Sequence, residues 1–110
     1  MAQRQIEYLF SEHEIRDTAD HVSSVADNEV FTIKTIIIHN SLNKAVSLQC
    51  EGSVDEENWF DIGASVSVSA QVNTYQTCDS YIPFFRITAA CAESPSSGSL
   101  TVVVCRVSGG

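Results

Sequence analysis

Basic residues are scarce in this chain of 110 residues, in which six Lys and Arg stand against fourteen Asp and Glu and leave a formal charge of −8. Nucleic-acid binding through a basic face needs clustered Lys and Arg that neutralise phosphates. An anionic membrane surface attracts proteins through the same side chains. The composition therefore argues against a nucleic-acid partner and against a membrane partner.

Long apolar runs are missing as well. No segment approaches the roughly 20 apolar residues that a membrane-spanning helix needs. The N-terminal residues MAQRQIEYLF lack a basic start followed by a long apolar stretch. We therefore expect no secretory signal peptide.

The cysteines form no C-x-x-C pair, because Cys50, Cys78, Cys91 and Cys105 lie 28, 13 and 14 residues apart. Zinc sites usually take two ligands from one tight turn, so this spacing argues against zinc. Cys50, Cys91 and Cys105 sit within apolar strand patterns, where cysteine behaves as a small buried hydrophobe. Buried thiols are the favoured interpretation, with structural disulfides as the alternative.

β-Branched residues dominate the composition: the chain has twelve Val, nine Ile and seven Thr, which favours strands. Alternating or short apolar patterns predict strands over residues 30–39, 45–51, 59–62, 65–70, 72–78, 81–91 and 100–107. We predict an all-β fold, a single β-sandwich or jelly roll of about seven to eight antiparallel strands. Its core is expected over residues 29–107, followed by a flexible tail over residues 108–110.

Residues 1–28 are expected to form an N-terminal arm, or a first strand followed by a loop. Helical and strand spacing both fit the apolar residues between 5 and 16, and residues 17–28 are polar. An arm can pair with an exposed strand edge of a neighbouring subunit, which predicts an interface at Ile6, Tyr8, Leu9 and Phe10. The competing hypothesis makes these residues the first strand of the subunit's own sandwich.

Four side chains are predicted for the structural core: Trp59, Phe85, Ile87 and Val103. Trp59 follows a polar turn over residues 52–58 and is expected to plug one end of the sandwich. Arg86 lies within an apolar strand and needs a carboxylate partner if it is buried. Asp61 and Asp79 are the candidate partners.

No catalytic arrangement is recognisable in the sequence, and we expect neither enzymatic activity nor a cofactor. Potential metal ligands gather at Glu12, His13, Glu14, Asp17, Asp20 and His21. A solvated acidic segment is the favoured interpretation of this cluster. The acidic turn over residues 55–61 lacks the alternation and the glycine of a dedicated calcium loop, so we expect no metal site there either.

Three motifs carry a resemblance to a known family. Residues 52–55 (GSVD) and 58–63 (NWFDIG) are similar to a G-S-x-D … N-W-x-x-x-G run, residues 81–88 (YIPFFRIT) to Y-x-P-F-x-R-V, and residues 92–100 (AESPSSGSL) to A-P-T-S-G-x-L. The pattern resembles small β-sandwich virion structural proteins of tailed phages, of the capsid-decorating or tail-associated type. It covers about residues 30–107.

The resemblance implies a non-enzymatic structural protein, with capsid decoration (cementing) and multimerisation on the virion surface as the leading hypothesis. The implied partners are copies of itself and a major capsid or tail protein. The implied location is the virion, after assembly in the host cytoplasm.

The alternative is a carbohydrate- or receptor-binding module on a virion tail or a cell surface. Its sugar-stacking platform would come from the aromatic residues Trp59, Phe60, Tyr75, Tyr81, Phe84 and Phe85. Trp and Tyr exposed together on one face would favour this alternative. A buried Trp59 would favour the structural protein.

Overall fold

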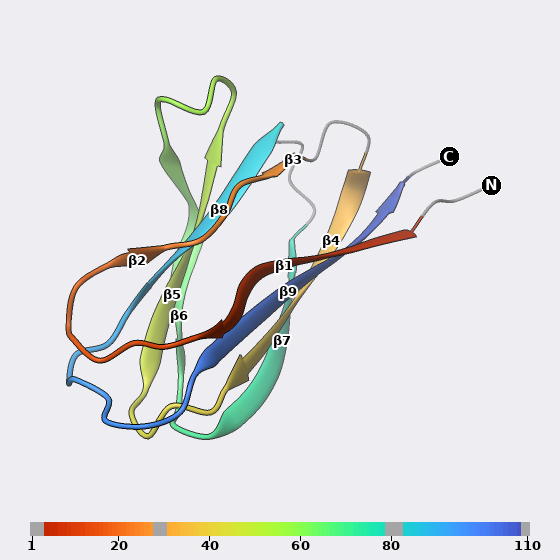
Figure 1. Cartoon of the computed structure of the whole chain (residues 1–110). Coiled ribbons are helices and arrows are strands. Elements are labelled where there is room, and N and C mark those ends of the chain that lie inside the picture. Colours follow the sequence, from red (N-terminus) through yellow and green to blue (C-terminus); the bar gives the residue numbers. More distant parts are fainter. Residues whose placement is uncertain (1–3, 28–30, 79–82, 109–110) are drawn as a thin grey trace.

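Two stacked antiparallel sheets form the protein (Figure 1), as seen in a computed structural model that describes residues 4–27, 31–78 and 83–108. The four-stranded sheet has the order β1 (Arg4–His13), β9 (Leu100–Ser108), β4 (Phe31–Asn40) and β7 (Val72–Cys78). The second sheet has the order β2 (His21–Val22), β8 (Phe84–Ala90), β5 (Val46–Ser53) and β6 (Phe60–Val68), with β3 (Ala26–Asp27) also paired to β8. The described residues contain no helix long and apolar enough to span a membrane.

The strand pairing is that of a rolled-up hairpin. β1 pairs with β9, β2 and β3 pair with β8, β4 pairs with β7, and β5 pairs with β6, all antiparallel. The chain thus folds back on itself, so that its first strand pairs with its last. Two further pairs, β4 with β9 and β5 with β8, connect these strand pairs into two sheets. With β2 and β3 taken as one interrupted strand, this is the eight-stranded jelly roll. The all-β prediction is confirmed.

Alternation along the strands builds the core between the sheets. In β8, Phe85, Ile87 and Ala89 are buried, and in the neighbouring strand β5, Val46 and Leu48 are buried on the same face. Successive side chains of a strand point to opposite faces, so each sheet gives one face to the core and the other to solvent. Phe85 and Ile87 therefore lie where the sequence placed them.

The N-terminal segment is the first strand of the subunit's own sandwich and not an arm. β1 pairs along β9 from Arg4 opposite Val107 to His13 opposite Leu100. A register shift between Tyr8 and Phe10 marks a bulge, which turns the adjacent Leu9 and Phe10 both inward, where they are 5% and 4% exposed. The interface prediction for Leu9 and Phe10 is corrected accordingly, because the core of their own subunit covers them.

The polar stretch after β1 is also part of the sandwich. Ser23 donates its backbone N–H to the Ile87 carbonyl (2.9 Å), and the Ile87 N–H donates to Ser23 Oγ (2.9 Å). Ala26 is fully buried. The Ser23 hydroxyl takes the place of a backbone partner in this ladder, so a polar sequence forms the edge of the second sheet. At the other end β9 runs to Ser108, and residues 109–110 of the expected tail lie outside the described residues.

A bulge merges two predicted strands into one. Residues 59–62 and 65–70 were expected as separate strands around Gly63, but β6 is continuous from Phe60 to Val68. Its register against β5 shifts between Leu48 and Cys50, and Gly63 has φ 68°. Glycine adopts this left-handed conformation at little cost, so Gly63 bends the strand without ending it.

Candidate functional site: the outer face of the four-stranded sheet

A row of four apolar side chains crosses the outer face of the four-stranded sheet, one from each strand. The register places Tyr8 opposite Val103, Val103 opposite Ile37, and Ile37 opposite Tyr75. Register partners point to the same side of a sheet. The row is therefore aromatic at both edges and aliphatic in the middle.

Two further rows lie beside this one on the same face. One consists of Ile6, Cys105, Thr35 and Thr77, and the other of Thr101, His39 and Asn73. We call the residues of these three rows the tyrosine face. None of them is Asp, Glu, Lys or Arg, although the chain contains fourteen acidic and six basic residues.

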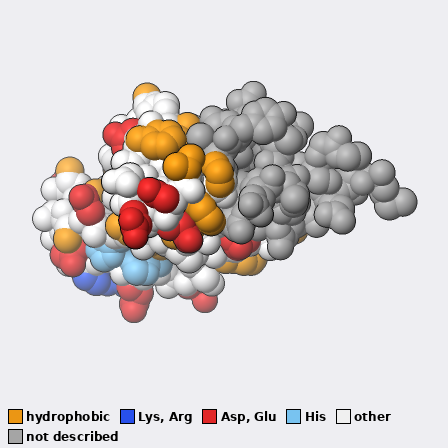
Figure 2. All heavy atoms as spheres, turned by 90° about the horizontal axis from the view of Figure 1, so that it is seen from above, with side chains coloured by type: hydrophobic (Ala, Val, Ile, Leu, Met, Phe, Trp, Pro, Cys, Tyr) orange, Lys and Arg blue, Asp and Glu red, His pale blue; other side chains and the backbone are white. Residues whose placement is uncertain are grey.

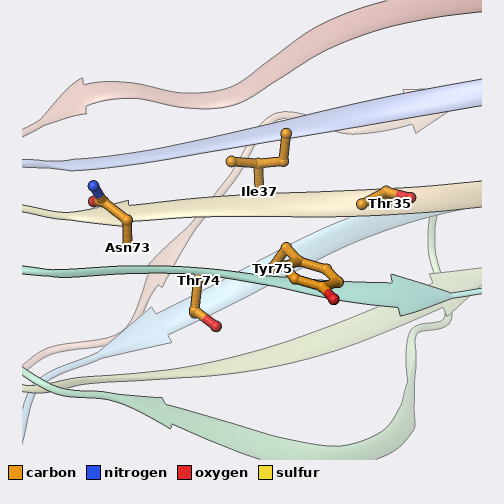
Figure 3. A pocket seen from close by; sticks show the side chains of 5 residues that line it. All are labelled: Thr35, Ile37, Asn73, Thr74 and Tyr75. Atoms are coloured by element: carbon orange, nitrogen blue, oxygen red, sulfur yellow. The ribbon is translucent and has the colours of Figure 1, made fainter.

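The tyrosine face exposes large apolar side chains. Ile6, Tyr8 and Tyr75 are 62%, 57% and 72% exposed. A shallow depression of about 340 Å³ lies beside Tyr75. Figure 3 shows its lining residues, which come from the neighbouring strands β4 and β7: Thr35, Ile37, Asn73, Thr74 and Tyr75. An exposed apolar patch of this kind is a candidate interaction surface.

No described carboxylate belongs to these rows, although Glu7 and Glu12 lie on β1, and many of the others lie on connections and turns. The exposed ones include Glu14, Asp17, Asp20, Asp55, Glu56, Glu57 and Glu93. Figure 2, which looks down on one end of the sandwich, shows several acidic side chains there. Glu12 stands at the border of the tyrosine face, since its backbone N–H donates to Thr101 Oγ1 (3.0 Å). The tyrosine face is thus an uncharged area on a strongly acidic molecule.

The outer face of the second sheet is polar and held by hydrogen bonds. Arg86 Nε donates to Glu51 Oε1 (2.8 Å), and Thr88 Oγ1 donates to the same oxygen (2.8 Å). Glu51 and Arg86 are also register partners. Glu51 is therefore the partner of Arg86; Asp61, one of the two expected partners, is not, and Asp79 lies outside the described residues.

Trp59 lies on this polar side and does not plug the core. Its ring stands 4.0 Å, measured to the centroid, from the Arg86 guanidinium, and its indole N–H donates to the Glu56 carbonyl (3.3 Å). Both contacts hold the half-buried indole over the sheet. Val103, the fourth predicted core residue, is buried, but in the middle of the tyrosine face. Trp59 and the exposed tyrosines therefore lie on opposite sheets.

A hydrogen-bonded chain of Asp17, His21 and His13 links the two sheets at one end of the sandwich. His21 Nε2 lies 2.8 Å from Asp17 Oδ1, and His21 Nδ1 lies 2.9 Å from His13 Nε2. His13 belongs to β1 and His21 to β2. Of the six potential metal ligands in this segment, these three come together through a turn and not along a helix. Among the described residues, no group of three or more His, Cys, Asp or Glu side chains is placed to hold a metal ion.

This chain of hydrogen bonds predicts a loss of stability in acid. Burial, with the neighbouring His21, lowers the pKa of His13 below its ordinary value of 6.5, and the hydrogen bond from His21 lowers the pKa of Asp17 below 3.8. A lowered pKa stabilises the fold above the unfolded-state value and loses that effect as pH falls through the folded-state value. We expect the free energy of unfolding, measured by urea denaturation, to fall below pH 6.5 and again below pH 3.8.

The control is His13→Gln, whose side-chain N–H can still donate to His21 Nδ1. It should remove the first decline and leave the second. An unchanged first decline in this variant would assign it to another group.

The acidic turn between β5 and β6 is held by its own side chain. Asp55 accepts hydrogen bonds from the backbone N–H groups of Asn58 and Glu57 (both 2.9 Å) and from Asn58 Nδ2 (2.9 Å). These hydrogen bonds hold the pKa of the Asp55 carboxyl well below its usual range. At the tip of the β5–β6 hairpin these backbone N–H groups have no partner on a neighbouring strand, and the Asp55 carboxylate accepts their hydrogen bonds instead. The polar sequence of this turn is therefore explained by its structure.

The described cysteines occupy interior or half-buried positions. Cys50 and Cys91 are buried, and Cys105 is partly exposed on the tyrosine face. Cys91 and Cys105 are free thiols, and burial raises the pKa of the Cys91 thiol. The side chain of Cys78 lies outside the described residues.

The comparisons with known proteins identify a fold. No protein-family model and no curated protein matches the chain. Among solved structures, the PBSX exported protein XepA superposes with a TM-score of 0.74 and 17% identity, over 96% of this chain and 37% of that one. The SPBc2 prophage-derived protein YomS superposes with a TM-score of 0.66 and 15% identity, over 98% of this chain and 96% of that one.

A third match is viral. A chain from the structure of infectious bursal disease virus Gx strain superposes with a TM-score of 0.56 and 8% identity, over 99% of this chain and 33% of that one. The chain therefore shares its fold with prophage-derived proteins and with a part of a virus. It spans little more than a third of XepA and nearly all of YomS.

The sequence indicated only part of the candidate site. It predicted an interface at Ile6 and Tyr8, and both are exposed on the tyrosine face. It missed Ile37 and placed Tyr75 only among possible sugar-binding aromatics. A signal was present in strand 72–78, where Asn73, Tyr75 and Thr77 alternate on one side. The strand register was needed to bring them beside β4.

Proposed function

We propose that this chain is a structural protein of a phage virion, and more narrowly a decoration protein that multimerises on the particle surface. The observation that carries the proposal is the fold-level match to YomS, a prophage-derived protein, over 98% of this chain and 96% of that one. A match over both whole lengths concerns the complete jelly roll and not one shared hairpin. The jelly roll also recurs in viral capsid domains.

The tyrosine face supports the same proposal. A decoration protein has to present an apolar surface that becomes buried only on assembly. Ile6, Tyr8 and Tyr75 provide such a surface on a rigid sheet. Its partners in the particle would be other copies of this chain and a major capsid or tail protein. In this proposal the chain has no catalytic role and no cofactor, and its location is the virion.

The test is the composition of the particle. Particles produced from the genome that encodes this chain should be purified on a density gradient and analysed by mass spectrometry and cryo-electron microscopy. We expect the chain at many copies per particle, in density on the outside of the shell. Its absence from purified particles, with recovery only in the soluble lysate, would contradict the proposal.

Carbohydrate binding is the second candidate, and the two exposed tyrosines favour it. Tyr8 and Tyr75 stand on one face, and aromatic faces stack on sugar rings. Trp59 does not join them, because it packs on Arg86 at the other sheet. Glycan-array binding that is lost in Tyr75→Ala and kept in Trp59→Ala would support this candidate.

A further inference from the structure

We propose that the tyrosine face is covered by the tyrosine face of a second copy of this chain, in a two-fold symmetric dimer. The inference deepens the proposed function, since it names the partner of one surface. Its test is made on the free protein in solution. A failure here leaves the particle test of the proposed function unaffected.

The distribution of charge on the chain favours self-association through the tyrosine face. The chain carries a formal charge of −8, so two copies repel each other across any contact that includes the acidic turns. The three rows of the tyrosine face contain no carboxylate. Two copies can therefore meet there without bringing like charges together, and like-charge contacts are costly at interfaces.

The central row also complements itself. Read across the sheet it runs Tyr8, Val103, Ile37 and Tyr75, aromatic at each end and aliphatic between. A two-fold axis parallel to the strands, lying between β9 and β4, reverses the row. Tyr8 of one copy then lies over Tyr75 of the other, and Val103 lies over Ile37. A two-fold interface requires a surface that matches itself in this way.

The area of the face indicates a reversible dimer. The three rows span about six residues along each strand at about 3.3 Å per residue, and the four strands lie about 4.8 Å apart, which gives a face of roughly 380 Å². Two such faces bury about 760 Å², which is below the roughly 1,000 Å² of a stable specific interface and typical of a weak, transient one. We therefore expect a dimer that dissociates on dilution.

The first experiment measures the mass of the free protein by sedimentation velocity from micromolar to millimolar concentration. We expect the wild type to shift from monomer to dimer. Tyr75→Lys should weaken dimerisation by roughly tenfold or more, as loss of an interface anchor does. The matched control is Val54→Lys, which makes the same charge change at an exposed apolar residue in the β5–β6 turn, where Val54 is 70% exposed. It should dimerise like the wild type.

The second experiment tests the symmetry by charge exchange. Tyr8→Lys and Tyr75→Glu should each impair dimerisation alone, and a mixture of the two should form a mixed dimer. Position 8 of one copy then faces position 75 of the other, with opposite charges. Circular dichroism of each variant establishes that it is folded before association is measured.

Three results would overturn the inference. The wild type could stay monomeric at millimolar concentration, including the case in which it binds a glycan at Tyr75 as a monomer. Val54→Lys could impair dimerisation as strongly as Tyr75→Lys, which would make the effect one of charge alone. The mixture of Tyr8→Lys and Tyr75→Glu could fail to associate, which would reject the two-fold arrangement.

Discussion

Phe10→Ala is expected to lower the free energy of unfolding by about 3–5 kcal/mol, the usual cost of removing a buried aromatic side chain. Phe10 is 4% exposed and belongs to the core cluster. Tyr8→Ala on the same strand should change the free energy by about 0.5 kcal/mol or less, because that side chain points to solvent. Urea denaturation of both variants, at concentrations where the chain is monomeric, measures the difference.

Deletion of residues 1–16 extends this prediction. Loss of β1 leaves β9 without one neighbour and opens the core at Leu9, Phe10 and Ile15, all of which are buried. We expect a truncated chain that is unfolded or aggregated by circular dichroism and gel filtration. A truncated chain that stays folded and monomeric would restore the arm hypothesis.

Gly98→Ala is expected to cost about 2–5 kcal/mol of unfolding free energy. The φ of Gly98 is 86°, which costs a residue with a Cβ about 1–2 kcal/mol. A Cβ at this position would also overlap the Ser41 carbonyl oxygen and lie 2.6 Å from the Ser41 carbonyl carbon. Overpacking of this kind adds about 1–3 kcal/mol. Backbone atoms cannot move away as a flexible side chain can.

Gly63→Ala is the matched control for this prediction. Gly63 has a similar φ of 68°, but a Cβ there would have no atom within 4 Å. It should cost about 1–2 kcal/mol, from the backbone conformation alone. Equal losses in the two variants, measured by thermal and urea denaturation, would show that the contact with Ser41 has no effect.

The close approach at Gly98 joins two connections that are distant in sequence. Ser41 and Ser99 exchange hydrogen bonds, with the Ser41 N–H donating to the Ser99 carbonyl (3.0 Å) and the Ser99 N–H donating to Ser41 Oγ (3.0 Å). The Ser96 N–H donates to Asn43 Oδ1 (3.0 Å). The Ser- and Gly-rich loop before β9 is therefore hydrogen-bonded to the connection after β4, and the two together close one end of the sandwich. Because their backbones lie so close, a single added methyl group is expected to lower the free energy of unfolding.

Local patterns were sufficient for the fold class because they arise from neighbours in sequence. Val46, Leu48 and Cys50 alternate with polar residues, and a period of two is a property of any half-buried strand. The same pattern did not distinguish strand from helix in residues 5–16. The bulge at Leu9 and Phe10 interrupts the alternation there, and only pairing with β9 reveals it.

Pairing between distant strands decided what local patterns left open. Arg86 pairs with Glu51 because β5 lies beside β8. The indole of Trp59 packs on Arg86 and not in the core.

The tyrosine face depends most completely on tertiary structure. By itself the sequence determined an acidic, all-β chain whose strands are separated by polar turns. Tyr8 and Tyr75 lie 67 positions apart in sequence, yet they occupy one row because β9 and β4 stand between their strands. The jelly roll pairs first strand with last, so its surfaces are assembled from both ends of the chain. Contacts of that kind are set by strand order and register, which no local periodicity encodes.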